Sequence, residues 1–186
     1  MDLIMLIFVG IGFILWGVIL LIKRKLMVSQ IFVTILNLFM SISFLPNLVN
    51  MMQPLGILIL VFSLSILNIL MNKGKYIIYG VEDNVVSEVL FDILKGETIS
   101  YDEKEYFLQL KDYDDKCIFY KQSSNSVEID LKDIRHLHLY EDIKDELKIK
   151  IQEVDSKLFP TSGVFYIMGG IGLLTFIQFL ESIIMK

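Results

Sequence analysis

The stretch LIMLIFVGIGFILWGVILLIKRK, residues 3 to 25, has twenty uncharged residues followed by three positive charges. About twenty apolar residues are enough for a helix to cross ~30 Å of hydrocarbon. A cleavable signal peptide would carry its basic residues before the apolar run, whereas here Lys23, Arg24 and Lys25 follow it. The stretch therefore predicts a membrane helix that is retained in the protein, with the basic end in the cytosol.

The composition of the whole chain agrees with a membrane protein. Of its 186 residues 54% are hydrophobic, which is too many for a soluble domain of this size. Three more apolar segments cover about residues 26–45, 55–71 and 162–183. We therefore expect four transmembrane helices: three within residues 1–72 (about 3–22, 26–45 and 55–71) and the fourth within residues 159–186. The sequence leaves open whether the second segment crosses the bilayer completely or re-enters it.

The residues between the third and fourth apolar segments differ sharply from the rest. From Gly74 to Lys157 there are 12 Lys or Arg against 20 Asp or Glu, a balance of −8, whereas the whole chain has a net charge of −5. An acidic domain disfavours nucleic-acid binding, because phosphate groups bind clustered Lys and Arg. It favours a protein partner with a neutral or basic surface. The only cysteine, Cys117, excludes an intrachain disulfide and is typical of a reducing compartment.

The pattern between residues 73 and 158 predicts a small α+β domain. Ile143, Leu147 and Ile151 recur at helical spacing, which indicates a closing amphipathic helix. Apolar and β-branched runs separated by turn compositions predict a strand, a helix ended by Gly96 and then a strand meander. In chain order, we expect a strand at 75–81, a helix at 85–94, strands at 98–101, 105–110, 117–122 and 126–131, and a helix at 140–155.

Positive charges predict how the chain lies in the membrane. Lys73 and Lys75 would share a side with Lys23, Arg24 and Lys25, whereas the segment PNLVNMMQP at residues 46–54 has no charge. We therefore expect a multi-pass cell-membrane protein with residues 73–158 in the cytosol and both termini outside. Its richness in Ile, Lys and Asn is typical of an AT-rich bacterial genome, which suggests a bacterial inner membrane.

Two polar stripes interrupt the apolar segments. The first consists of Gln30, Thr34, Asn37 and Ser41, and the second of Ser65, Asn68 and Asn72; both follow helical spacing. Amide groups are costly in hydrocarbon, so each stripe should face protein or water. One interpretation is that the stripes hydrogen-bond between helices. The other is that several copies of the chain turn them toward a shared, hydrated pathway.

Glycines mark the first and last apolar segments. Gly10 and Gly17 are seven residues apart, as are Gly163 and Gly170, and this spacing puts each pair on one helix face. Small residues on one face let two membrane helices approach closely. We predict that the helix-packing surface consists of Gly10, Gly17, Gly163, Gly169, Gly170 and Gly172.

No catalytic motif accompanies these features. The run GGIG at residues 169–172 lacks the Lys-Ser/Thr of a phosphate-binding loop and lies in an apolar segment. His136 and His138 have no third ligand at a fixed offset, so we expect neither a metal site nor another cofactor. The leading hypothesis is an accessory or regulatory membrane protein, not an enzyme, whose helices oligomerise or bind a membrane partner and whose cytosolic domain binds a protein or small ligand. The alternative is a homo-oligomeric pore or membrane-perturbing effector that this domain gates.

Overall fold

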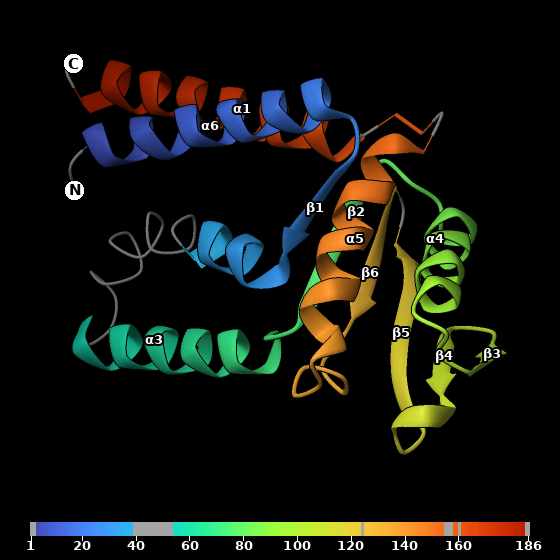
Figure 1. Cartoon of the computed structure of the whole chain (residues 1–186). Helices are drawn as coiled ribbons and strands as arrows, with labels where there is room; N and C mark the ends of the chain where they lie inside the picture. Colours follow the sequence, from blue (N-terminus) through green and yellow to red (C-terminus); the bar gives the residue numbers. More distant parts are fainter. Residues whose placement is uncertain (1–2, 39–53, 124, 155–157, 160, 185–186) are drawn as a thin grey trace. The chain divides into compact units, whose positions relative to one another are not determined.

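The computed structural model describes residues 3–38, 54–123, 125–154, 158–159 and 161–184. The chain divides into two compact units. The helical unit lies within residues 1–22, 31–72 and 161–186, and the α+β unit lies within residues 23–30 and 73–160. Figure 1 labels the helices and strands of both units.

The helical unit contains α1 (Leu3–Lys23), helical residues 31–38, α3 (Pro54–Met71) and α6 (Thr161–Ile184). The α1 helix ends at a basic residue, Lys23, and the next residue, Arg24, turns the chain with a φ of 47°. Within the described part of the chain, two helical stretches are long and apolar enough to cross a membrane, Leu6–Lys23 and Thr161–Phe179. These two helices indicate that the protein associates with a membrane.

The expected four-span helical fold is wrong, because the structure is an α+β fold with two candidate spans. The second predicted span, 26–45, fails at its start: Leu26–Ser29 form strand β1, which pairs with a strand of the α+β unit. The third, 55–71, falls in α3, whose fully described apolar stretch, Phe62–Met71, is shorter than the two candidate spans. An uninterrupted apolar run is compatible with a buried strand as well as with a helix, and composition alone does not separate the two.

The α+β unit is built on one antiparallel sheet of six strands in the order β1-β2-β6-β5-β4-β3. The strand β1 lies at one edge and pairs with β2 from Leu26↔Tyr79 to Ser29↔Tyr76. The other edge is β3, which is short and exposed. The remaining bounds are β2 (Lys75–Tyr79), β3 (Tyr101–Lys104), β4 (Phe107–Leu110), β5 (Lys116–Ser123) and β6 (Ser126–Asp130), with the 3₁₀ turn η1 at Lys111–Tyr113.

Helices α4 (Asp83–Gly96) and α5 (Leu139–Glu153) cover one face of this sheet. Alternate strand residues such as Ile118 and Ile129 are fully buried in a core with Leu90 of α4 and Leu147 of α5. Because side chains alternate along a strand, the residues between them point to the opposite face. That second face carries Phe107, Cys117, Phe119, Lys121 and Glu128, and we call it the open face.

The helices and most strands of the α+β unit lie where the sequence predicts them, but β3 does not. The expected strand at 98–101 is replaced by a turn in which Thr98 takes a φ of 57° and Ser100 donates its backbone N–H to Asp112 at 2.6 Å. The strand begins at Tyr101 and runs through Asp102, Glu103 and Lys104, which resemble a turn in composition. An edge strand facing water does not need apolar alternation, so its sequence resembles a loop.

Candidate functional site

The glycines of α1 and α6 form a close helix contact. A Cβ atom added at Gly17 would lie 2.5 Å from the Gly163 carbonyl oxygen, and one added at Gly170 would lie 2.6 Å from the Gly10 carbonyl oxygen. Because the later glycine of α1 meets the earlier glycine of α6, the helices run antiparallel. Figure 1 shows them side by side with the N and C ends at the same end of the pair. Only hydrogen atoms at these four positions allow so close a backbone contact.

The other predicted packing glycines lie outside this contact. For Gly169 and Gly172 of α6, nothing in the described part of the chain lies within 4 Å of an added Cβ atom, and the same holds for Gly12 of α1. The structure therefore brings together Gly10 with Gly170 and Gly17 with Gly163, but leaves Gly169 and Gly172 with open space.

The polar stripes are placed in several different surroundings. Asn72, which directly follows α3, donates its side-chain N–H to the side-chain carbonyl oxygen of Asn68 on that helix, so these two stripe residues are paired with each other. Ser65 also has an interaction partner in the structure. Gln30 has a buried Oε1 with no hydrogen-bond partner among the described residues, and Thr34 is half-buried. Ser41 lies outside the described residues.

Asn37 contributes to a mainly apolar cavity of about 290 Å³ inside the helical unit. Ser162 also lines this cavity, and its buried Oγ has no hydrogen-bond partner among the residues that the structure describes. The ring of Phe13 stacks on that of Tyr166, with centroids 5.7 Å apart, at its wall. Phe165 and Gly169 complete the lining.

A polar groove lies between α5 and the β1 edge of the sheet in the α+β unit. Its first part, between β1 and α5, has a volume of about 230 Å³. An adjoining part of about 360 Å³ shares Asp145 and Lys148 with it, and the described residues that line this second part all belong to α5. Met27 and Ser29 alternate along β1 and so face α5 together. The groove is lined by Met27, Ser29, Tyr76, Lys144, Asp145 and Lys148, and then by Ile149 and Gln152.

The groove contains two lysines in different electrostatic environments. Lys144 forms ion pairs with Glu141 and, at 3.6 Å, with Asp145. Lys148, one helical turn further on, makes no ion pair with any residue that the structure describes. At the end of the second part, Lys25 donates to the backbone carbonyl of Gln152 at 2.7 Å and to that of Val154. These two bonds satisfy carbonyl groups at the C-terminal end of α5 and join the segment after α1 to this helix.

Tyr76 forms part of the groove and is held by a hydrogen bond. Its hydroxyl lies 2.8 Å from that of Tyr140 on α5. Burial, and then this hydrogen bond, raise the pKa of Tyr76 well above its usual 10.0. The phenol therefore stays protonated over the physiological range and keeps its hydrogen bond with Tyr140.

The raised pKa of Tyr76 predicts an alkaline loss of stability. The unfolded chain releases this proton near pH 10, below the pH at which the folded chain does, so the stabilisation is complete below pH 10 and is lost as the pH rises further. Tyr76→Phe should remove this part of the pH dependence and lower the free energy of unfolding by about 1 kcal/mol at pH 7, through the lost hydrogen bond. Denaturant unfolding of both proteins between pH 7 and 11 checks this. If the free energies of unfolding of the two proteins fell in parallel above pH 10, the prediction would be wrong.

The open face of the sheet carries an aromatic pair. Phe107 on β4 and Phe119 on β5 are directly opposite each other, and their ring centroids are 5.3 Å apart. The Lys104 ammonium lies 5.3 Å from the Phe107 centroid. Phe119 is 43% exposed and the neighbouring Tyr106 is 54% exposed, which is unusual for large aromatic side chains. The free thiol of Cys117 shares this face, and burial raises its pKa, so it is a weak nucleophile.

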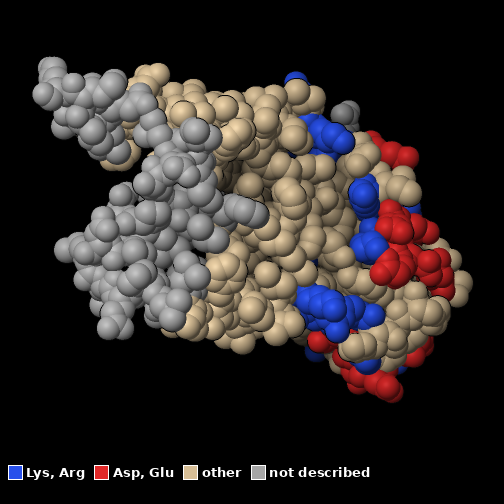
Figure 2. Space-filling view, turned by 90° about the vertical axis from the view of Figure 1, so that its left-hand side faces the viewer, with Lys and Arg blue, Asp and Glu red and all other residues tan. Residues whose placement is uncertain are grey.

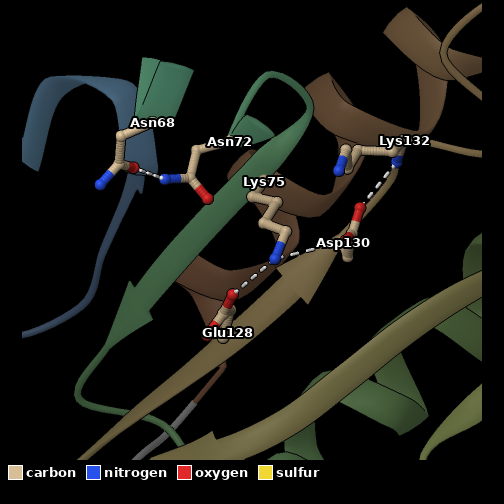
Figure 3. A network of polar contacts seen from close by, with 6 residues as sticks. All are labelled: Asn68, Asn72, Lys75, Glu128, Asp130 and Lys132. Atoms are coloured by element: carbon tan, nitrogen blue, oxygen red, sulfur yellow. Dashed lines mark hydrogen bonds and ion pairs between the residues drawn. The ribbon is translucent and has the colours of Figure 1, made fainter. Parts of the chain in front are cut away.

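An ion-pair network borders the aromatic pair. The Lys75 ammonium lies 3.4 Å from Glu128 and 3.6 Å from Asp130, and the backbone N–H of Lys132 donates to Asp130 at 2.9 Å (Figure 3). Asp130 is paired across the sheet with Phe119. This network fixes charged side chains beside an apolar patch, an arrangement typical of the rim of a protein-binding surface.

The charges of the α+β unit are unevenly distributed. It holds 16 of the 17 Lys and Arg residues and 20 of the 22 Asp and Glu residues. Figure 2 shows the basic side chains of the viewed face in a band, with acidic side chains gathered along one side of it. The two kinds of charge are therefore unevenly spread over the viewed face.

No family model, curated protein or solved structure matches the chain, so its function is inferred from its own residues. Sequence reasoning missed the groove, because Lys144 and Lys148 follow the pattern of a solvated helix face and β1 resembles part of a membrane helix. The spacing of these lysines by four residues was the only available signal. The described residues contain no group of three His, Cys, Asp or Glu side chains that could hold a metal ion.

Proposed function

We propose that this chain is a non-enzymatic accessory protein, anchored in a membrane by α1 and α6, whose α+β unit binds a partner protein through the open face. The observation that carries this proposal is the aromatic pair of the half-buried Phe107 and the exposed Phe119 beside a charged rim. Exposed aromatic clusters in folded domains mark interaction surfaces, and aromatic residues provide much of the binding energy there. Helices α4 and α5 occupy the other face of the sheet, so the open face is the one left for a partner.

The antiparallel contact of α1 with α6 supports an orientation in the membrane. The C-terminal end of α1 and the N-terminal end of α6 lie at the same end of the pair, and both lead directly into the α+β unit. Lys23, Arg24 and Lys25 lie at this end, and such clusters remain on the cytosolic side. We therefore place the α+β unit in the cytosol of a cell-membrane protein, with the opposite ends of α1 and α6 outside.

The partner's chemistry follows from charge and from the unused glycines. The acidic balance of the α+β unit favours a neutral or basic protein surface and disfavours nucleic acid. Gly169 and Gly172 have open space in which a further helix, from a second copy of the chain or from a membrane partner, can approach α6.

Photo-crosslinking from the open face tests the proposal. A crosslinking amino acid replaces Lys121, which is exposed beside Phe119, in the full chain in its native membrane. The expected result is one dominant crosslinked protein, whose yield falls at least fivefold when Phe119→Ser is added. The matched control carries the crosslinker at Glu88, which is exposed on α4 and on the covered side of the sheet. Equal yields from both positions, or a yield unaffected by Phe119→Ser, would refute binding at the open face.

A further inference from the structure

We infer that the groove between β1 and α5 binds the phosphate of an anionic lipid headgroup. This site is separate from the open face and depends on membrane association alone, not on a partner protein. It would hold the α+β unit against an anionic bilayer.

The groove offers several hydrogen-bond donors suited to a phosphate oxygen. Lys144 and Lys148 lie one helical turn apart on α5 and line the same groove as the hydroxyls of Ser29 and Tyr76. Lys148 is the strongest candidate ligand, because no described carboxylate pairs with its ammonium. Ammonium groups bind phosphate as point charges.

Acidic residues reduce the positive charge of the groove but do not remove it. Asp145 lines it and Glu141 lies beside it, and both pair with Lys144. The described lining of the groove holds two ammonium groups, of Lys144 and Lys148, against the one carboxylate of Asp145, and the Lys25 ammonium lies at the Gln152 end. A phosphate that enters must compete with Asp145 for Lys144, which makes Asp145 an inhibitory residue in this site.

Covalent connection keeps the groove close to the membrane surface. Met27 lines the groove and follows the last residue of α1, Lys23, by only four residues. A fully extended chain covers at most ~3.6 Å per residue, so the backbone at Met27 lies within about 14 Å of the end of α1. Headgroup regions are several ångströms thick and the Debye length is about 8 Å at physiological ionic strength, so the lysines act within the field of the lipids.

The short connection between the groove and α1 favours a lipid headgroup over free phosphate as the source of the anion. A headgroup is held at the end of α1, so its local concentration at the groove is high, whereas a soluble phosphate has no such advantage. The sequence supports the same choice, because Lys23, Arg24 and Lys25 directly follow the apolar part of α1. Clustered basic residues next to a membrane helix attract anionic lipids by about 1 kcal/mol each, or about fivefold.

Native mass spectrometry of the full chain in neutral detergent tests this site. Phosphatidylglycerol, phosphatidylcholine and inorganic phosphate are titrated in turn, and the bound fraction gives each apparent Kd. We expect phosphatidylglycerol to bind more tightly than the other two. Lys148→Gln should weaken its binding about fivefold, whereas Asp145→Asn should strengthen it. The matched control, Lys116→Gln on β5, lies two strands away from β2 and should leave the affinity unchanged.

The opposite signs expected for Lys148→Gln and Asp145→Asn separate binding from misfolding, because an unfolded variant does not bind more tightly. Equal losses in Lys148→Gln and Lys116→Gln would show attraction by overall charge only and would overturn the site. The same affinity for phosphatidylglycerol and phosphatidylcholine would also overturn it. Inorganic phosphate that binds as tightly as phosphatidylglycerol and displaces it would refute the lipid as the source.

Discussion

Gly80→Ala is expected to lower the free energy of unfolding of the α+β unit by about 3 kcal/mol or more. Gly80 has a φ of +74°, a left-handed conformation that costs other residues about 1–2 kcal/mol. An added Cβ atom would also lie 2.0 Å from the carbonyl oxygen of Arg24, far inside contact distance. Because this oxygen belongs to backbone, the substitution must push β1 away from β2. Denaturant unfolding gives the energy, and hydrogen exchange of the β1 and β2 amides locates the damage.

Gly96→Ala is the matched control for Gly80→Ala. Gly96 is the last residue of α4, has no positive φ, and an added Cβ atom would meet no described atom within 4 Å. Alanine favours the helix by up to about 1 kcal/mol, so this variant should be neutral or more stable. If Gly80→Ala lost no more stability than Gly96→Ala, the close approach of Arg24 to Gly80 would be wrong.

Gly170→Ala should separate α1 from α6 in the helical unit. The added methyl group would lie 2.6 Å from the Gly10 carbonyl oxygen and 2.7 Å from Ile14 Cγ1, so the two backbones must move apart. Overpacking of this kind typically costs about 1–3 kcal/mol. The measurement is thermal unfolding in detergent, together with disulfide crosslinking between cysteines introduced at the α1–α6 contact.

The neighbouring residue provides the control for Gly170→Ala. Gly169→Ala places its methyl group in open space, so it should keep the α1–α6 crosslink and stabilise α6 by up to about 1 kcal/mol. The two substitutions should differ in stability because Gly170 faces α1 and Gly169 does not. Equal destabilisation by both substitutions would contradict the antiparallel contact.

The sequence predicted much of the α+β unit because its core follows simple periodicities. Ile143, Leu147 and Ile151 of α5 are all buried, as their spacing required. On β5 and β6, Ile118, Tyr120, Val127 and Ile129 alternate with outward residues. These patterns arise because each element buries one face, which is the physical basis of the prediction.

The number of membrane spans could not be predicted from the sequence, because it depends on which residues pair with distant residues in a sheet. Leu26, Met27 and Val28 are apolar in either state, and only pairing with β2, about fifty residues later, makes Leu26–Ser29 a strand. Local sequence contains no information on that partner. The edge strand β3 was misplaced for the converse reason, since Asp102 and Glu103 face water and so carry no strand periodicity.

The candidate sites were predicted only in part. Gly10 and Gly17 are as far apart in sequence as Gly163 and Gly170. The spacings match because the two antiparallel helices share one line of contact. The groove required β1 to be recognised as a strand, because Met27 and Ser29 face α5 only in that conformation. Because the sequence did not predict β1, it did not predict the groove either.

The contact between Gly10 and Gly170 also determines the order of assembly during synthesis. Its two halves are separated by 160 residues, so α1 leaves the ribosome long before its partner exists. At roughly 5–20 residues per second, α1 waits on the order of ten seconds while the entire α+β unit is made. During this interval the glycine face of α1 has no α6 to pack against, so lipid, an earlier segment of the same chain or another protein must cover it.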